Sequence, residues 1–199
     1  MSEPEAVVVR HGETEWSRDG RHTSITDLEL TDEGRRQAQQ AGQRLAGREW
    51  ALILTSPRRR ARETAALAGV GEHAVIDDDL SEWNYGEYEG LTSAQILTRH
   101  PGWSLWRDGC PGGEDAADVT RRVDRLIVRV RAVEQPGAVL LFAHGHILRV
   151  FGARWIGLDA AWGRAFSLGT ASIGTLGWEH HAAAVAEWND TSHLTSPAS

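Results

Sequence analysis

Short apolar runs alternate along this chain with segments of helical spacing, and this alternation limits its fold more than any other feature. Three of the runs contain no charged side chain: Ala6–Val9, Trp50–Thr55 and Ala138–Phe142. A strand that is apolar at consecutive positions is buried on both faces, which is typical of parallel sheets covered by helices. We therefore expect an α/β fold of three layers, α/β/α, around a mostly parallel central sheet.

Capping and spacing signals predict the helices between these runs. Thr31 is an expected N-cap, because two acidic residues follow it and apolar residues recur at helical spacing up to about Gly47. The other helices are expected over residues 56–68, with Pro57 at the first position, over 93–99, over 115–134, and after His146 up to about Ile156. The expected helix over 115–134 carries five arginines, and we expect them to form a solvated outer face; they are at positions 121, 122, 125, 129 and 131.

Shorter patterns complete the predicted elements. Residues 73–76 suggest a third, shorter strand, and residues 171–178 and 181–188 suggest a late hairpin. No repeat, low-complexity tract or linker interrupts the chain. We therefore expect one domain over residues 1–189 and a disordered C-terminal tail over residues 190–199.

The composition argues against several classes of protein. No run of eighteen apolar residues occurs in the 199-residue chain, so we expect no membrane span. The net charge of −7 argues against a nucleic-acid partner, since phosphate backbones favour basic proteins. The acidic N-terminus lacks the pattern of a secretion signal, and the single cysteine, Cys110, cannot form an internal disulfide, so a cytoplasmic location is expected. The oligomeric state is left open, a homodimer included.

Two histidines are expected at one edge of the predicted sheet. His11 follows the first apolar run and His144 follows the fourth predicted strand, and ligands bind beyond the carboxyl ends of such strands. All 21 basic residues are arginine, whose planar fork binds phosphate oxygens two at a time. The shared placement of the two histidines favours a functional role over that of ordinary surface or core residues.

Four segments then stand out in order: RHGET at 10–14, SPRRRARETA at 56–65, LSEWNYG at 80–86 and AHGH at 143–146. Together they resemble the histidine phosphatase superfamily, in the branch that holds phosphoglycerate mutases and many small phosphatases. The resemblance covers residues 6–188, and residues 106–110 and 142–146 are most similar to acid phosphatases and sugar bisphosphatases. It implies a phosphoglycerate mutase-like fold and the hydrolysis of small phosphate monoesters, such as sugar phosphates.

The resemblance also implies the roles of five residues. His11 would be the nucleophile and would become a phosphohistidine; a neutral imidazole is competent near pH 7, because its ordinary pKa is about 6.5. Arg10, Arg60 and His144 would hold the phosphate oxygens, Arg60 being the arginine that fits the family's Ser-x-x-x-Arg-Ala-x-x-Thr pattern. Glu82 would protonate the leaving oxygen and then deprotonate the attacking water.

Further substrate contacts are expected from Ser17, Thr23, Arg58, Tyr85 and Gly145. Ser17 departs from the family, since many relatives carry asparagine there. Arg58 would assist at the rim of the pocket, whereas Arg59 and Arg62 are expected in solvent. No His-Glu-x-x-His pattern or Cys/His cluster occurs, and His144 and His146 are expected to point in different directions at a strand end, so no metal and no cofactor are expected.

Two alternatives to a phosphatase are a phosphomutase and a non-catalytic phosphate-binding module. A phosphomutase must hold a second acidic group of its substrate, and the region from Gly86 to Glu114 offers only Arg99 and Arg107 for this. Four carboxylates in the same region, Glu87, Glu89, Asp108 and Glu114, are expected to repel such a group, although Arg21 or Arg121 could supply charge from elsewhere. A non-catalytic phosphate-binding module would be expected to lack one of the five catalytic residues, and all five are present.

Overall fold

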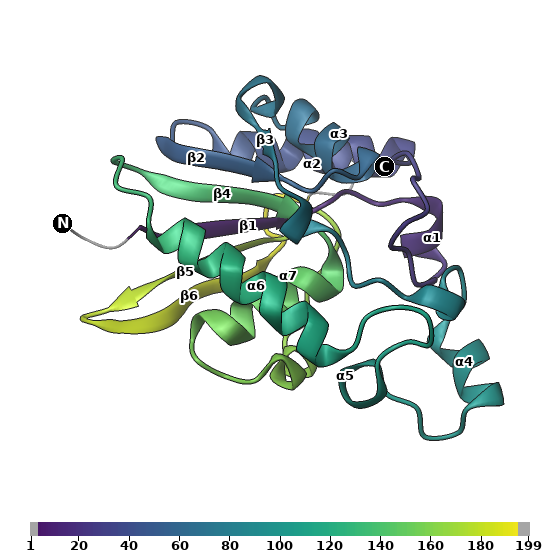
Figure 1. Ribbon diagram of the computed structural model, residues 1–199. Helices are drawn as coiled ribbons and strands as arrows, with labels where there is room; N and C mark the ends of the chain where they lie inside the picture. Colours follow the sequence, from purple (N-terminus) through teal and green to yellow (C-terminus); the bar gives the residue numbers. More distant parts are fainter. Residues whose placement is uncertain (1–3, 195–199) are drawn as a thin grey trace.

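The central sheet has the predicted mostly parallel character. The computed structural model describes residues 4–194, and within them six strands form one sheet in the order β3-β2-β4-β1-β5-β6 (Figure 1). The pairs β1–β4, β2–β4 and β2–β3 are parallel. β5 pairs antiparallel with β1, and β6 pairs antiparallel with β5. The strands are β1 (Ala6–Arg10), β2 (Trp50–Thr55), β3 (Val75–Ile76), β4 (Ala138–Ala143), β5 (Ile173–Glu179) and β6 (Ala182–Asp190).

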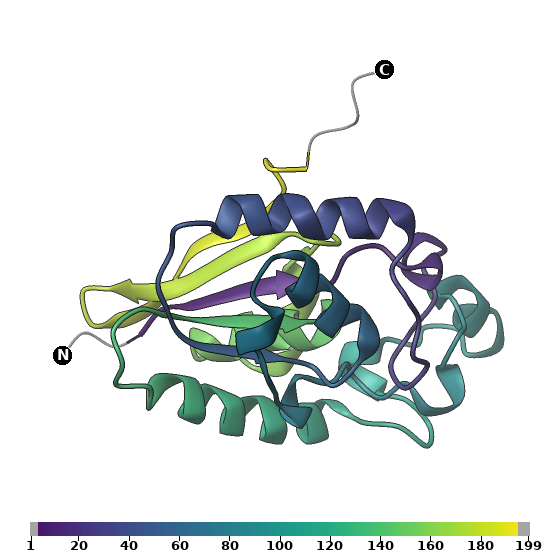
Figure 2. The same cartoon turned by 90° about the horizontal axis from the view of Figure 1, so that it is seen from above.

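Helices cover both faces of this sheet, which confirms the three-layer α/β/α prediction. α2 (Asp32–Leu45) and α3 (Arg59–Leu67) pack on one face, and α6 (Ala116–Arg131) and α7 (Gly145–Trp155) pack on the other. Figure 2 shows α2 and α6 on opposite sides of the sheet. In the part of the chain that the structure describes, every helix is too short or too polar to cross a membrane.

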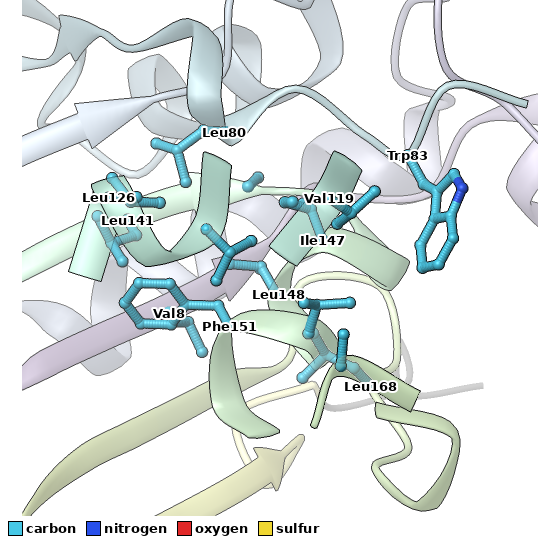
Figure 3. Packing of buried hydrophobic residues seen from close by; sticks show 14 of the residues in the cluster. Val8, Leu80, Trp83, Val119, Leu126, Leu141, Ile147, Leu148, Phe151 and Leu168 are labelled. Carbon is cyan, nitrogen blue, oxygen red and sulfur yellow. The ribbon is translucent and has the colours of Figure 1, made fainter. Parts of the chain in front are cut away.

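The alternation of side chains along β1 explains why two cores form. Val7 and Val9 pack with α2 and α3 in one cluster, whereas Ala6 and Val8 pack with α6 and α7 in the other. All four residues are fully buried. Figure 3 shows Val8 of this second core among Leu141, Leu148 and Phe151. A strand buried on both faces must be apolar at every position, which is the pattern that predicted the fold.

Several predicted boundaries are wrong by a few residues. The helix expected from Ser56 begins at Arg59, because the Ser56 amide still donates to Phe142 O and continues the pairing of β2 with β4. Pro57 is therefore not the first helical residue. The third strand is only Val75–Ile76, since a 3₁₀ turn occupies the residues before it.

Other boundaries are close to those predicted. Thr31 caps α2 as expected, and α4 (Ser93–Arg99) has the predicted bounds. α6 lies within the expected 115–134, with Asp115 as its N-cap. The expected tail over 190–199 starts too early, because Asp190 ends β6 and pairs with Ile173. Residues 195–199 lie outside the described residues.

The arginines of α6 do not all lie on a solvated face. Arg122 is buried and donates to the Glu114 carboxylate at 2.7 and 2.8 Å. It also donates to three main-chain carbonyls, those of Asp79, Ser81 and Glu82. Arg131 is half-buried, and its Cζ lies 4.7 Å from the Trp155 ring centre and 4.9 Å from that of Trp178. Arg122 thus anchors the segment that carries Glu82.

We expect Arg122→Met to lower the free energy of unfolding by about 3 kcal/mol or more. The change leaves the partly buried Glu114 carboxylate and three carbonyls without their donor. Arg121→Met is the matched control: the Arg121 side chain is exposed, and its ion pair with Asp118 is worth about 1 kcal/mol at most. Urea unfolding of both variants measures the difference, and equal losses would contradict the anchoring role.

Candidate active site

A cavity of about 230 Å³ lies at the carboxyl ends of the parallel strands. β1 and β4 end level with each other, Arg10 opposite Ala143, so the residues that follow both strands meet there. In Figure 1, α1 (Glu15–Arg18) lies beyond these ends. Seven of the predicted site residues line this cavity: Arg10, His11, Ser17, Thr23, Glu82, Tyr85 and Gly145.

A second, larger cavity of about 860 Å³ lies at the opposite edge of the sheet. Its walls include Glu5, Glu49 and Gly137, which immediately precede β1, β2 and β4. None of the predicted site residues lines it. The candidate site is therefore the smaller cavity, where the imidazoles and guanidinium groups gather.

His11 is held as a neutral imidazole. Its amide donates to Ala143 O at 2.9 Å, and its Nδ1 lies 2.7 Å from Gly12 O, a carbonyl that can only accept. Nδ1 therefore carries the hydrogen and Nε2 keeps its lone pair. Burial lowers the pKa of His11 well below its ordinary value of 6.5, and the charges of Arg60 and Arg10 lower it further. Nε2 is thus available as a nucleophile at neutral and mildly acidic pH.

The residue after His11 must be glycine. A Cβ on Gly12 would lie 2.3 Å from the carbonyl oxygen of Gly34 in α2. This close approach brings the loop after β1 against the start of α2, and the Gly12 amide donates to the hydroxyl of Thr64 in α3. The glycine of the RHGE segment therefore seats the His11 loop between two helices.

Arg60 and His144 lie behind His11 and outside the cavity lining. Arg60 is fully buried, and its Nε donates to Nδ1 of His144 at 3.1 Å. Nε2 of His144 therefore carries the hydrogen and donates to the Ser56 hydroxyl at 2.7 Å. The ring centroids of His144 and His11 are 5.2 Å apart. The structure brings both predicted residues beside the nucleophile, but their polar atoms are engaged with the protein.

Arg10, the last residue of β1, lines the cavity. Its Nη1 donates to Leu168 O at 2.6 Å, while its buried Nε has no hydrogen-bond partner within residues 4–194. The guanidinium packs over the start of α7, where a Cβ on Gly145 would make an ordinary contact of 3.5 Å with the Arg10 Cζ. Arg10 thus has donor capacity for an anion in the cavity.

Glu82 accepts hydrogen bonds from the first turn of α7. Its Oε1 accepts from the amides of Trp83 and Ile147, both at 2.8 Å, and its Oε2 from the amide of His146 at 2.9 Å. The side chain is buried yet lines the cavity. A carboxylate held by three main-chain donors has one orientation, which suits a group that must deliver a proton to one atom.

The remaining predicted contacts differ in outcome. The Ser17 hydroxyl lines the cavity, but it also exchanges hydrogen bonds with the main chain of Thr14 and caps α1. Thr23 lines the cavity and its carbonyl accepts from Arg60. Arg58 is not among the residues that line the cavity, and its Nη1 donates to Ile25 O at 3.4 Å. Assistance from Arg58 at the pocket rim stays a prediction.

Sequence reasoning missed part of the cavity wall. His22, Ser93, His146, Arg149 and Leu168 also line it. A signal was available in the sequence: Arg149 follows His146, the last residue of the AHGH segment, by three positions. This spacing puts both side chains on one face of a helix. His146 does differ in direction from His144, with its Nδ1 2.6 Å from the Tyr85 hydroxyl, but it is a helical residue and not a strand residue as expected.

The expected acidic mouth is absent from the cavity lining. Glu89 accepts from the amides of Ser24 and Thr26, Glu114 pairs with Arg122, and Asp108 pairs with Arg107. Among the described residues, Glu82 is the one carboxylate in the cavity lining, and the lining also contains three arginines, Arg10, Arg21 and Arg149. The charge argument against a second acidic group was therefore wrong, since Glu89 and Glu114 are paired within the protein and the exposed Glu87 and Asp108 lie outside the cavity lining.

No metal site is evident in the described part of the chain. Within residues 4–194, no group of three His, Cys, Asp or Glu side chains lies close enough to hold a metal ion. Cys110 is buried, and burial raises the pKa of its thiol to about 12, so a metal-binding thiolate is disfavoured there.

Comparison with known proteins agrees with this geometry. Residues 6–191 match the histidine phosphatase superfamily, branch 1, and the chain belongs to this family. It is similar to an acid phosphatase of Mycobacterium tuberculosis, with 44% identity covering 94% of this chain and 93% of the relative. It is also similar to a sedoheptulose 1,7-bisphosphatase of Saccharomyces cerevisiae, with 37% identity covering 78% and 68% of the two chains.

Solved structures show the same fold. One from Mycobacterium tuberculosis, described as that of an open reading frame, superposes with a TM-score of 0.89 at 42% identity and covers 94% of this chain and 97% of the other. A mycobacterial glucosyl-3-phosphoglycerate phosphatase with bound VO3 gives a TM-score of 0.85 at 32% identity, covering 94% and 100%. The protein is a small-molecule phosphatase of this superfamily, a phosphoric monoester hydrolase.

We expect the buried His22 to make the fold less stable in acid. Burial lowers the pKa of His22 to about 4, against an opposing effect of Glu89, so between pH 6.5 and 4 the unfolded chain binds a proton that the folded chain excludes. The free energy of unfolding should then fall by up to about 1.4 kcal/mol per pH unit in this window from His22 alone. His22→Gln should flatten the slope by that amount, as measured by urea unfolding at several pH values.

The control for this prediction is Ser93→Ala. The Ser93 hydroxyl lies 3.3 Å from Nε2 of His22, so its removal perturbs the same contact without removing a titrating group. Its pH slope should match that of the natural protein. A slope that is the same in His22→Gln as in the natural protein would contradict the assignment.

Proposed function

We propose that the protein hydrolyses small phosphate monoesters, such as sugar phosphates, through a phosphohistidine on His11. The observation that carries this proposal is the His11 ring itself: its Nδ1–H faces Gly12 O, its pKa is lowered by burial, and it lines a cavity with Arg10 and Glu82. The names of the relatives, an acid phosphatase and a sedoheptulose 1,7-bisphosphatase, support the same class of substrate.

In the first step, Nε2 of His11 attacks the phosphorus atom in line with the ester oxygen. The N–P bond forms as the P–O bond to the leaving alcohol breaks, and Glu82 gives its proton to the departing oxygen. Arg10 donates hydrogen bonds to the phosphoryl oxygens. Arg60 supplies positive charge from behind the ring; its effect on the pKa of His11 indicates that this charge reaches the reacting atoms.

In the second step, water replaces the alcohol. Glu82, now ionised, takes a proton from the water as its oxygen attacks phosphorus, and the P–N bond breaks to release inorganic phosphate. His11 returns to its neutral form, and Glu82 again carries the proton. His144 orients Arg60 through its Nδ1, and the proposed substrate contacts are Ser17, Thr23, Tyr85 and Gly145.

We also propose that one domain, which includes Asp190 at the end of β6, carries this activity in the cytoplasm. The single sheet with two cores supports one domain. A single buried cysteine is compatible with a reducing compartment. The partner is a small phosphorylated metabolite.

We expect His11→Ala to abolish turnover of p-nitrophenyl phosphate, to below about one part in a thousand, since deletion of a nucleophile is not compensated by its neighbours. The exposed His180, in the turn between β5 and β6, offers the control: His180→Ala should keep full activity. Steady-state rates and thermal melts of both variants are the measurements. Activity of His11→Ala above that level, in a folded sample, would refute the nucleophile assignment.

We expect Glu82→Gln to slow alkyl phosphates far more than p-nitrophenyl phosphate. An alkoxide needs a proton as it leaves, whereas p-nitrophenolate is stable enough to leave without one, so a general acid worth about 10²–10⁴-fold matters mainly for the alkyl ester. Rapid-quench measurement of the first turnover separates the phosphorylation step from hydrolysis. The same loss of phosphorylation rate on both substrates would contradict the role of Glu82.

A further inference from the structure

We propose that the natural substrate carries a second anionic group, a phosphate or a carboxylate, and that Arg149 binds it. This inference rests on the proposed function and names the substrate class of the same cavity. One phosphoryl group is already provided for by Arg10, with Arg60 behind His11. Arg149 and Arg21 add two further guanidinium groups to the lining. The transfer of one phosphoryl group does not require these two.

The guanidinium of Arg149 is fixed in place at the cavity wall. Its Nε donates to Gly163 O at 3.0 Å and its Nη2 to Arg164 O at 3.3 Å. Its Cζ lies 4.7 Å from the centre of the Trp106 ring, which packs so closely on Gly163 that a Cβ there would lie 2.6 Å from the indole. These contacts hold the fork rigid, which reduces the entropy lost when it binds an anion.

Donor capacity remains on this fork. Within residues 4–194, Nη1 of Arg149 has no hydrogen-bond partner and the side chain has no carboxylate in ion-pair range. Arg154, on the same helix, differs: its Nε and Nη2 both pair with Asp124. Arg149 is half-buried, so a charge without a partner is costly there, and an anionic ligand would supply the missing partner.

The groups around Arg149 suit an anion on a polar substrate. His146, three residues earlier on α7, is kept neutral because burial lowers its pKa well below 6.5, an effect that the charge of Arg149 reinforces. His22 and Ser93 add neutral hydrogen-bonding groups to the same lining. The nearest acid of the lining, Glu82, is already engaged by three amides and belongs to the reaction centre.

The test compares substrates that differ only in the second charge. 3-Phosphoglycerate against glycerol 3-phosphate tests a carboxylate, and fructose 1,6-bisphosphate against fructose 1-phosphate tests a second phosphate. For each pair the selectivity is the ratio of kcat/KM values. We expect the natural protein to prefer the member with two anionic groups in at least one pair, and the preference to weaken at high ionic strength.

Three variants then isolate Arg149. Arg149→Gln should lower the selectivity at least tenfold, mainly through KM of the doubly charged substrate, and Arg149→Lys should keep part of it, since the charge remains without the fork. Arg154→Gln, which removes an arginine of the same helix outside the cavity lining, should leave the selectivity unchanged. The pair that responds to Arg149→Gln distinguishes the carboxylate from the phosphate.

The outcomes separate this inference from the proposed function. If the natural protein turns over p-nitrophenyl phosphate but Arg149→Gln leaves both selectivities unchanged, or if neither pair shows a preference, the anionic subsite is refuted and the phosphatase stands. If the natural protein turns over no phosphate ester, both proposals fall. Accumulation of 2-phosphoglycerate ahead of inorganic phosphate, followed by phosphorus NMR, would refute hydrolysis while supporting the subsite.

Discussion

The active site depends on one buried cation, the guanidinium of Arg60. It lies where three distant segments meet: it donates to Nδ1 of His144 after β4 and to the carbonyls of Thr23, Ser24 and Thr26 in the loop after α1. A buried charge is tolerated only when its donors are satisfied, and here a ring nitrogen and three carbonyls do this without a carboxylate. Its positive charge is therefore not cancelled by an ion pair and acts on the neighbouring imidazoles of His11 and His144.

That arrangement determines the state of the imidazoles. Because Arg60 donates to Nδ1 of His144, the other nitrogen of His144 must carry its hydrogen. The same charge, added to burial, lowers the pKa of both His144 and His11 well below the ordinary value. Histidines held in this way stay neutral in mild acid, at the cost of burying groups that the unfolded chain would protonate.

The loop that holds Arg60 is secured by a carboxylate far along the chain. Glu89 accepts from the amides of Ser24 and Thr26 and from the Ser24 hydroxyl, so it fixes the carbonyls that surround Arg60. Glu114 does the same for the Glu82 segment through Arg122. Acidic residues of one stretch of sequence thus support the site from outside, while the cavity itself stays positive.

The sequence by itself determined the layers of the fold and placed His11 and His144 at one edge of the sheet. Runs such as Ala6–Val9 are local patterns that reflect burial on both faces of a sheet. In the RHGE segment, Gly12 is required because a Cβ there would collide with the main chain of Gly34. The tertiary structure decided what each charge does. Arg122 and Glu89 were expected in solvent or at the cavity mouth, and Arg149 was not singled out at all. The carbonyls that Arg122 contacts lie 40 to 43 residues away, and the amides that Glu89 contacts lie 63 and 65 residues away. Hydrophobic periodicity says nothing about which charge meets which, because that depends on how the loops beyond the strand ends pack together.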